Sequence, residues 1–198
     1  NKTKNSRGVK KMKHYRNINV HQAVMQRIEH AFKEFDNIML AFSGGKDSGV
    51  LLNLTYDYAK RSNQLDKLGV YFLDYEAQYQ LTIDYVQAEF ERLVDIKRYW
   101  LCLPNSVPSA TSMTTGYWIP WDKKKRDIWV REMPEYDYVI NEDNVPFDYT
   151  IGQSDYEVQE NFTKWFSKKH GKTGVLIGIR ADESLDRFRA IKSKNKTN

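Results

Sequence analysis

Cysteine is almost absent from this chain, whose 198 residues include only Cys102. One cysteine cannot form an internal disulfide or a zinc site built from several cysteines, and such scarcity favours a reducing, cytoplasmic environment. Cys102 lies in the apolar stretch RYWLCL. A buried and chemically inert thiol is the usual outcome at such a position, so we expect no redox role for it.

Long hydrophobic runs are also missing, since the apolar runs of the sequence extend over only a few residues. We therefore expect no transmembrane helix and no membrane partner. The basic, polar beginning lacks the apolar core of a secretory signal, which again favours the cytoplasm. Apolar residues make up 40% of the chain and aromatic residues 14%. This is a globular composition, and the length suits one domain with an insertion.

Acidic residues are absent from residues 1–16, which carry seven lysines and arginines, and three more lysines lie in residues 191–198. The net charge of the whole chain is +5, so the part between these ends is acidic overall. We expect residues 1–17 to be a basic tail and residues 18–198 to be the folded domain. Basic ends either attract a polyanion such as nucleic acid or are simply solvated.

Proline is missing everywhere except in residues 104–150, which hold all five prolines and interrupt the regular pattern of the chain. A long segment without periodicity is often a lid or a functional insertion. Trp118, Trp121 and Trp129 surround the charged cluster DKKKRD in this insertion. These tryptophans either stack on a flat ligand or pack the insertion onto the sheet, and we favour packing.

The remaining sequence alternates short apolar runs with amphipathic stretches. The apolar runs predict buried strands at 37–42, 68–74, 97–103 and 174–179. The amphipathic stretches predict helices at 20–35, 48–61, 83–94 and 154–171, and a further helix or turn at 180–191. This alternation predicts an α/β fold with a doubly wound, mainly parallel sheet and flanking helices. In such sheets ligands bind beyond the carboxyl ends of the strands.

Local signals mark the ends of two of these helices. Asn19 and Gln22 have the spacing of a capping box, as do Ser154 and Glu157. Gly171 suits the end of the helix that begins at Ser154, because glycine readily adopts the left-handed conformation found there. On the helix at 83–94, we expect the apolar face to include Leu93 and Val94.

The stretch NIMLAFSGGKDSGVLLNL, residues 37–54, places two glycines and a lysine between a predicted strand and a predicted helix. Adjacent glycines let several backbone N–H groups point into one concavity, at the positive end of the following helix dipole. Ser43 and Ser48 add hydroxyls and Lys46 adds a charge, so an anion is the natural guest. Asp47 suits a helix cap or a Mg²⁺ ligand. The spacing is neither that of a Walker A loop nor that of a G-x-G-x-x-G motif.

The six residues SGGKDS resemble the pyrophosphate loop of the PP-loop nucleotide enzymes, which include ATP pyrophosphatases and sulfonucleotide reductases. The segment GIRADESLDRFR at 178–189 is similar to the phosphoadenosine phosphosulfate (PAPS) reductase branch. FLDYEAQYQLTIDYV and YWIPWDKKKRDIWVR further resemble a reductase-like subfamily of plasmid and phage proteins. The resemblance implies an adenine nucleotide alpha hydrolase-like fold, a place in sulfur metabolism and a ParB-like partner.

The resemblance also implies roles for individual residues. The loop would bind the β- and γ-phosphates of ATP, or the sulfate end of an adenylyl-sulfate, through Ser43, Gly44, Gly45, Lys46, Asp47 and Ser48. The backbone near residues 40–42 and near residues 72–74, with Asp74, would hold the adenosine. Arg180 and Arg187 would bind phosphate or sulfate oxygens, and Glu183 would orient one of them. Lys46, Asp47 and Arg180 would be catalytic, and Asp47 would face Mg²⁺ if ATP is the ligand.

One departure from the family leaves three functions open. The reductases carry a late Glu-Cys-Gly-x-His segment, and this chain has none. The first expectation is therefore an ATP pyrophosphatase that cleaves the α–β bond to activate a substrate. The second is a phosphoadenylyl-sulfate reductase or sulfur-transfer enzyme. The third is a nucleotide-responsive regulatory module without turnover.

Overall fold

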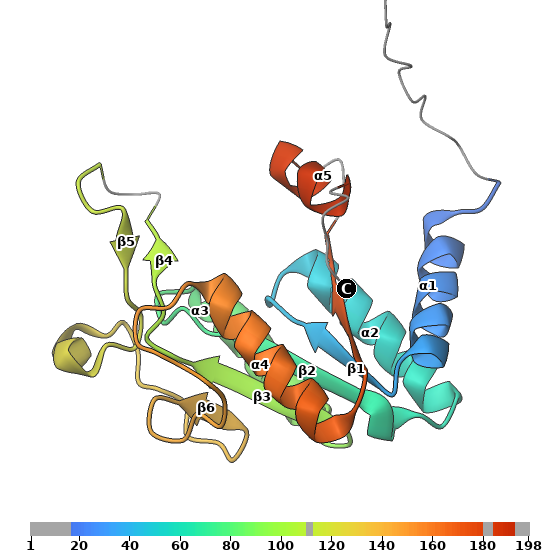
Figure 1. The fold of residues 1–198 in the computed structure, drawn as a ribbon, viewed down its shortest axis with the longest axis horizontal. Coiled ribbons are helices and arrows are strands. Elements are labelled where there is room, and N and C mark those ends of the chain that lie inside the picture. The colour runs from blue at the N-terminus through green and yellow to red at the C-terminus, as the bar shows by residue number, and fades with distance from the viewer. Residues whose placement is uncertain (1–16, 110–112, 180–183, 193–198) are drawn as a thin grey trace, which may run out of the picture.

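The computed structural model describes residues 17–109, 113–179 and 184–192. It has an α/β fold in which a five-stranded parallel sheet carries helices on both faces, as predicted (Figure 1). The sheet consists of β1 (Asn37–Ala41), β2 (Leu68–Leu73), β3 (Lys97–Cys102), β6 (Val139–Asn141) and β7 (Thr173–Ile177). The helices are α1 (Val20–Glu34), α2 (Lys46–Arg61), α3 (Gln80–Arg92), α4 (Asp155–His170) and α5 (Leu185–Lys192). Within these described ranges, no helix has the length and apolar character needed to cross a membrane.

The strand order β6-β3-β2-β1-β7 defines where a ligand is expected to bind. The chain builds outward from β1 through β2 and β3 to β6, and then returns through α4 to place β7 on the other side of β1. Met39 of β1 accordingly pairs with Gly69 on one side and with Val175 on the other. Open parallel sheets bind ligands at such a reversal, beyond the carboxyl ends of the strands.

Two apolar cores cover the two faces of the sheet. One core joins α1, α2 and α3 to the sheet through side chains such as Phe32, Leu52 and Phe90. The other places α4 against the opposite face through Phe162 and Phe166 (Figure 1). Alternation along the strands explains this division, because successive side chains of a strand point to opposite faces. Both faces are therefore buried, as expected for a parallel sheet.

The predicted helix signals are confirmed at both capping boxes. The Asn19 side chain accepts from Gln22 N at 2.8 Å, and Ser154 and Glu157 form the equivalent pair at the start of α4. Gly171 ends α4 with φ of 105°, as the sequence suggested. The expectation for Val94 is wrong: α3 ends at Arg92, and the Val94 side chain is 70% exposed.

The insertion at 104–150 adds to the sheet instead of lying apart from it. It contributes a short hairpin of β4 (Val107–Pro108) and β5 (Tyr117–Trp118), a 3₁₀ segment over Lys123–Ile128, and the edge strand β6. Trp121 is 1% exposed, and its ring centroid lies 5.1 Å from that of Trp129. The packing interpretation is confirmed for Trp121.

Candidate functional site

The turn Ser43–Gly45 joins β1 to α2 beside the reversal of strand order. Gly44 has φ of 71°, a left-handed backbone conformation that residues with a Cβ rarely adopt. A Cβ on Gly44 would also lie 2.6 Å from Cγ2 of Thr82 and 2.8 Å from Cγ2 of Val86, both on α3. Glycine is therefore required here by the backbone conformation and by the space available.

The two predicted serines hold the turn together. Ser48 Oγ donates to the carbonyl oxygen of Gly45 at 2.9 Å and accepts from Ser43 N at 3.2 Å. The two hydroxyl oxygens lie 3.0 Å apart. Ser48 is buried and Ser43 is exposed, so Ser43 is the hydroxyl that a bound molecule would reach.

The first turn of α2 begins directly after this loop. Its N-cap residue is Gly45, and no side chain among the described residues caps that position. The first N–H groups of a helix lack intrahelical acceptors and lie at the positive end of the helix dipole. Lys46 is exposed at the same end. This arrangement suits an anion.

An open pocket of about 660 Å³ lies over the loop, which we call the loop pocket. It is lined by Ser43, Gly44, Gly45, Ala77, Gln78, Tyr79, Thr82 and Val130. Ala77, Gln78 and Tyr79 reach this pocket because they and the loop follow strands that end at the same edge of the sheet. The sequence did not predict Val130, because the insertion has no periodicity from which its position could be read.

Asp47 lies on another side of the helix start. It lines a groove between α1, α2 and β7, and it is not among the residues that line the loop pocket. Gly178 follows β7 and lies against this same first turn, because a Cβ on Gly178 would be 3.1 Å from Ser48 N. The structure thus brings the beginning of the GIRADES segment next to the SGGKDS loop.

The later residues of that segment are less fully described. Arg180 and Glu183 lie outside the described residues. Arg187 is exposed on α5, and its backbone N–H donates to Ser184 Oγ at 3.2 Å. In Figure 1, α5 stands beyond the carboxyl end of β7.

Asp74 follows β2 at the predicted edge of the sheet, but its side chain is fully buried. Its Oδ2 accepts from Trp100 Nε1 at 2.6 Å, and its Oδ1 forms an ion pair with Arg131 of the insertion. These contacts leave the backbone near Asp74 as the part that could contact adenosine. The predicted contact stays a prediction.

Cys102 is buried at the end of β3, as predicted. Burial raises the pKa of its thiol well above the ordinary value, and the Asp74 carboxylate, whose Oδ2 lies 3.8 Å from Sγ, adds to this effect. Because the thiolate is the nucleophilic form of cysteine, this environment makes Cys102 a poor nucleophile.

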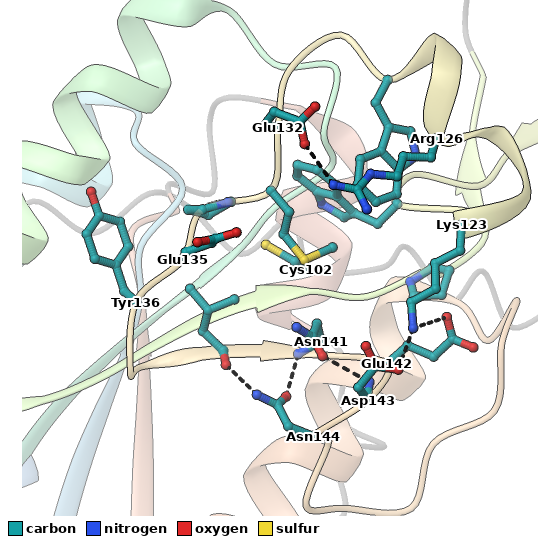
Figure 2. A pocket seen from close by; sticks show the side chains of 16 residues that line it. Cys102, Lys123, Arg126, Glu132, Glu135, Tyr136, Asn141, Glu142, Asp143 and Asn144 are labelled. Atoms are coloured by element: carbon teal, nitrogen blue, oxygen red, sulfur yellow. Dashed lines mark hydrogen bonds and ion pairs between the residues drawn. The ribbon is translucent and has the colours of Figure 1, made fainter.

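A second cavity, of about 620 Å³, lies beyond β3 and β6 and is walled by the insertion (Figure 2). Cys102, Trp121 and Trp129 contribute to its lining. The two cations at this cavity already have acidic partners: Lys123 pairs with Asp143 and Glu142, and Arg126 pairs with Glu132. Throughout the described ranges, this cavity included, no three His, Cys, Asp or Glu residues form a group that could hold a metal ion.

Comparison with known proteins finds a relative that resembles most of this chain. The chain is 36% identical over 181 residues to the uncharacterized protein YbdN of Escherichia coli strain K12. The matched region covers 90% of this chain but 43% of YbdN, so the chain spans less than half the length of that relative. No family model matches the chain.

Proposed function

We propose that the chain is a PP-loop nucleotide-binding enzyme that binds ATP or an adenylyl-sulfate and cleaves ATP at the α–β bond to activate a substrate. The observation that supports this most is the Ser43–Gly45 turn. A glycine with positive φ, an uncapped helix start and an exposed lysine meet there at the reversal of strand order. This is the chemistry and the position expected for a phosphate site in an α/β sheet.

In the proposed reaction, an oxygen atom of the substrate attacks the α-phosphorus of ATP. The bond between that phosphorus and the bridging oxygen breaks, and pyrophosphate leaves with the bonding electrons. The backbone N–H groups at the start of α2 and the Lys46 ammonium stabilise the negative charge of the leaving group. The rest of the rate enhancement comes from holding the two reactants in line.

Asp47 is the proposed contact for magnesium, from the side of the helix start that faces the groove between α1, α2 and β7. One carboxylate beside a phosphate loop is a reasonable donor set, because proteins commonly bind Mg²⁺ through one or two carboxylates together with the phosphates of the nucleotide. The ion would neutralise phosphate charge when ATP is bound. Arg180 and Arg187 are proposed to contact the same oxygens, with Glu183 orienting one arginine.

The first experiment is calorimetric binding of ATP, adenylyl sulfate and phosphoadenylyl sulfate, followed by measurement of pyrophosphate release with candidate acceptors. We expect Lys46→Ala and Asp47→Ala to weaken binding and release. Lys60→Ala is the matched control, because Lys60 is an exposed lysine at the far end of the same helix. If the first two variants behave like the control, the site assignment is wrong.

The two other functions have less support. A reductase or sulfur-transfer activity needs a thiol nucleophile, and the buried Cys102 with its raised pKa is poorly suited to that role. Absence of sulfite release in a thioredoxin-coupled assay would exclude it. A regulatory module would bind nucleotide without turnover. In that case, contact with a ParB-like protein or, through the basic ends, with nucleic acid would be its output, and truncation of residues 1–16 would reduce salt-sensitive DNA binding.

A further inference from the structure

Two buried acids next to the loop pocket fasten the insertion to the sheet. Glu76 is 7% exposed and lies two residues after Asp74. Its Oε2 accepts from Trp121 N at 2.9 Å, and its Oε1 accepts from Val130 N at 3.1 Å. Arg131 Nε donates to the carbonyl oxygen of Glu76 at 3.2 Å, while its guanidinium pairs with Asp74. We call Asp74, Glu76 and Arg131 the clasp.

The clasp joins two segments that line the loop pocket together with the Ser43–Gly45 turn. Ala77–Tyr79 follow Glu76 directly, and Val130 precedes Arg131. The side chain of Val130 is 64% exposed while its N–H is bonded to Glu76, so it is fixed by its backbone and open to a ligand. The clasp therefore sets the distance between Val130 and the rest of this pocket.

Backbone strain is concentrated at Glu76 of the clasp and at its hydrogen-bond partner Trp121. Among the described residues other than glycine, positive φ occurs at Asn63, Glu76 and Trp121. Asn63 follows the end of α2, and asparagine tolerates this conformation. Glu76 at φ 61° and Trp121 at φ 54° are bonded to each other through the Trp121 N–H. Residues held in such conformations tend to occur at functional sites, where the surrounding contacts enforce them.

Resting on the proposed function, we propose that Asp74, Glu76 and Arg131 are positioning residues of the nucleotide site. They hold Val130 in the wall of the loop pocket, and nucleotide affinity depends on them although their side chains do not touch the nucleotide. The insertion is thereby a fixed wall of this site. The buried carboxylates of Asp74 and Glu76 act on Arg131, on the Trp100 side chain and on backbone N–H groups instead of on the ligand.

The chain contains a matched control for this proposal. Arg126 also belongs to the insertion, pairs with a carboxylate (Glu132) and lies over a tryptophan ring, with its guanidinium carbon 5.7 Å from the centroid of Trp129. The guanidinium carbon of Arg131 lies 4.9 Å from the centroid of Trp121. Arg126 lines the second cavity and not the loop pocket.

The experiment compares Arg131→Lys, Arg131→Met and Arg126→Met with the wild-type chain. Calorimetry measures the affinity for ATP and phosphoadenylyl sulfate at a temperature where circular dichroism shows each protein folded. We expect Arg131→Lys to weaken binding about tenfold, because lysine keeps the charge opposite Asp74 but cannot bridge to Glu76 at the same time. Arg126→Met should stay within about twofold of wild type, because its pair is at the surface and away from the pocket.

Arg131→Met leaves Asp74 buried without its cation and is expected to destabilise the fold strongly, so Val130→Ala provides an independent test. It should weaken nucleotide binding while Val94→Ala, at a comparably exposed valine, should not. Unchanged affinity in folded Arg131→Lys and in Val130→Ala would overturn the proposal. If the wild type binds neither nucleotide, the proposed function fails. Hydrogen exchange at the Val130 amide then decides on the clasp alone: exchange should be faster in Arg131→Lys than in Arg126→Met, and equal rates would overturn it.

Discussion

Replacing Gly44 by alanine tests the geometry of the phosphate loop most directly. The left-handed backbone at φ 71° costs an alanine about 1 kcal/mol. The added Cβ would also lie 2.6 Å and 2.8 Å from methyl carbons of Thr82 and Val86. Overpacking of this kind in a close-packed region costs about 1–3 kcal/mol. We therefore expect Gly44→Ala to lower the free energy of unfolding by about 2–4 kcal/mol.

Comparison with Gly152→Ala separates the cost of the left-handed backbone from the cost of overpacking. Gly152 has φ of 82°, and a Cβ there would meet no heavy atom within 4 Å. Its alanine variant should therefore lose only the backbone contribution, about 1 kcal/mol. Urea unfolding of the wild type and both variants measures the difference. If Gly44→Ala is destabilised no more than Gly152→Ala, the contact between the loop and α3 is not as described, and the packing argument for this glycine fails.

Three further predictions concern local features away from the loop. Asn19→Ala and Ser154→Ala should each lower the free energy of unfolding by about 1 kcal/mol in urea titrations, because each removes a capping side chain; no change would contradict the cap assignment. Cys102 should react with iodoacetamide much more slowly in the folded protein than in urea, because burial raises the pKa of its thiol; equal rates would contradict that environment. Partial burial and neighbouring lysines lower the pKa of His170 from 6.5 in the folded protein. As the pH drops below 6.5, His170 is therefore protonated in the unfolded chain before it is protonated in the folded one, and the free energy of unfolding should fall. His170→Phe should flatten this dependence, and an unchanged slope would contradict it.

The features that could be predicted from the sequence are those set by neighbouring residues. Asn19 with Gln22 and Ser154 with Glu157 were recognisable because a capping box is complete within four positions. The longer strands were recognisable because burial on both faces requires continuous apolar runs. β6 was missed because Val139–Asn141 is too short to show a pattern, and its place beside β3 depends on contacts distant in sequence. Val94 was misplaced because periodicity alone does not locate the end of α3.

In the candidate site, too, the features set by neighbouring residues could be predicted, and those set by contacts distant in sequence could not. The loop residues Ser43–Ser48 are consecutive, so their chemistry is visible in the sequence. Asp74 was also expected at this edge, since it follows a strand, but the strand end does not reveal what a carboxylate will bind. In the structure its charge is opposed by Arg131, which lies 57 positions away, and both groups are largely shielded from water. A buried carboxylate requires such a partner, because leaving it unpaired would cost several kcal/mol. The need to neutralise Asp74 therefore fixes the insertion beside the phosphate loop, and an uncharged residue at either position would remove that constraint.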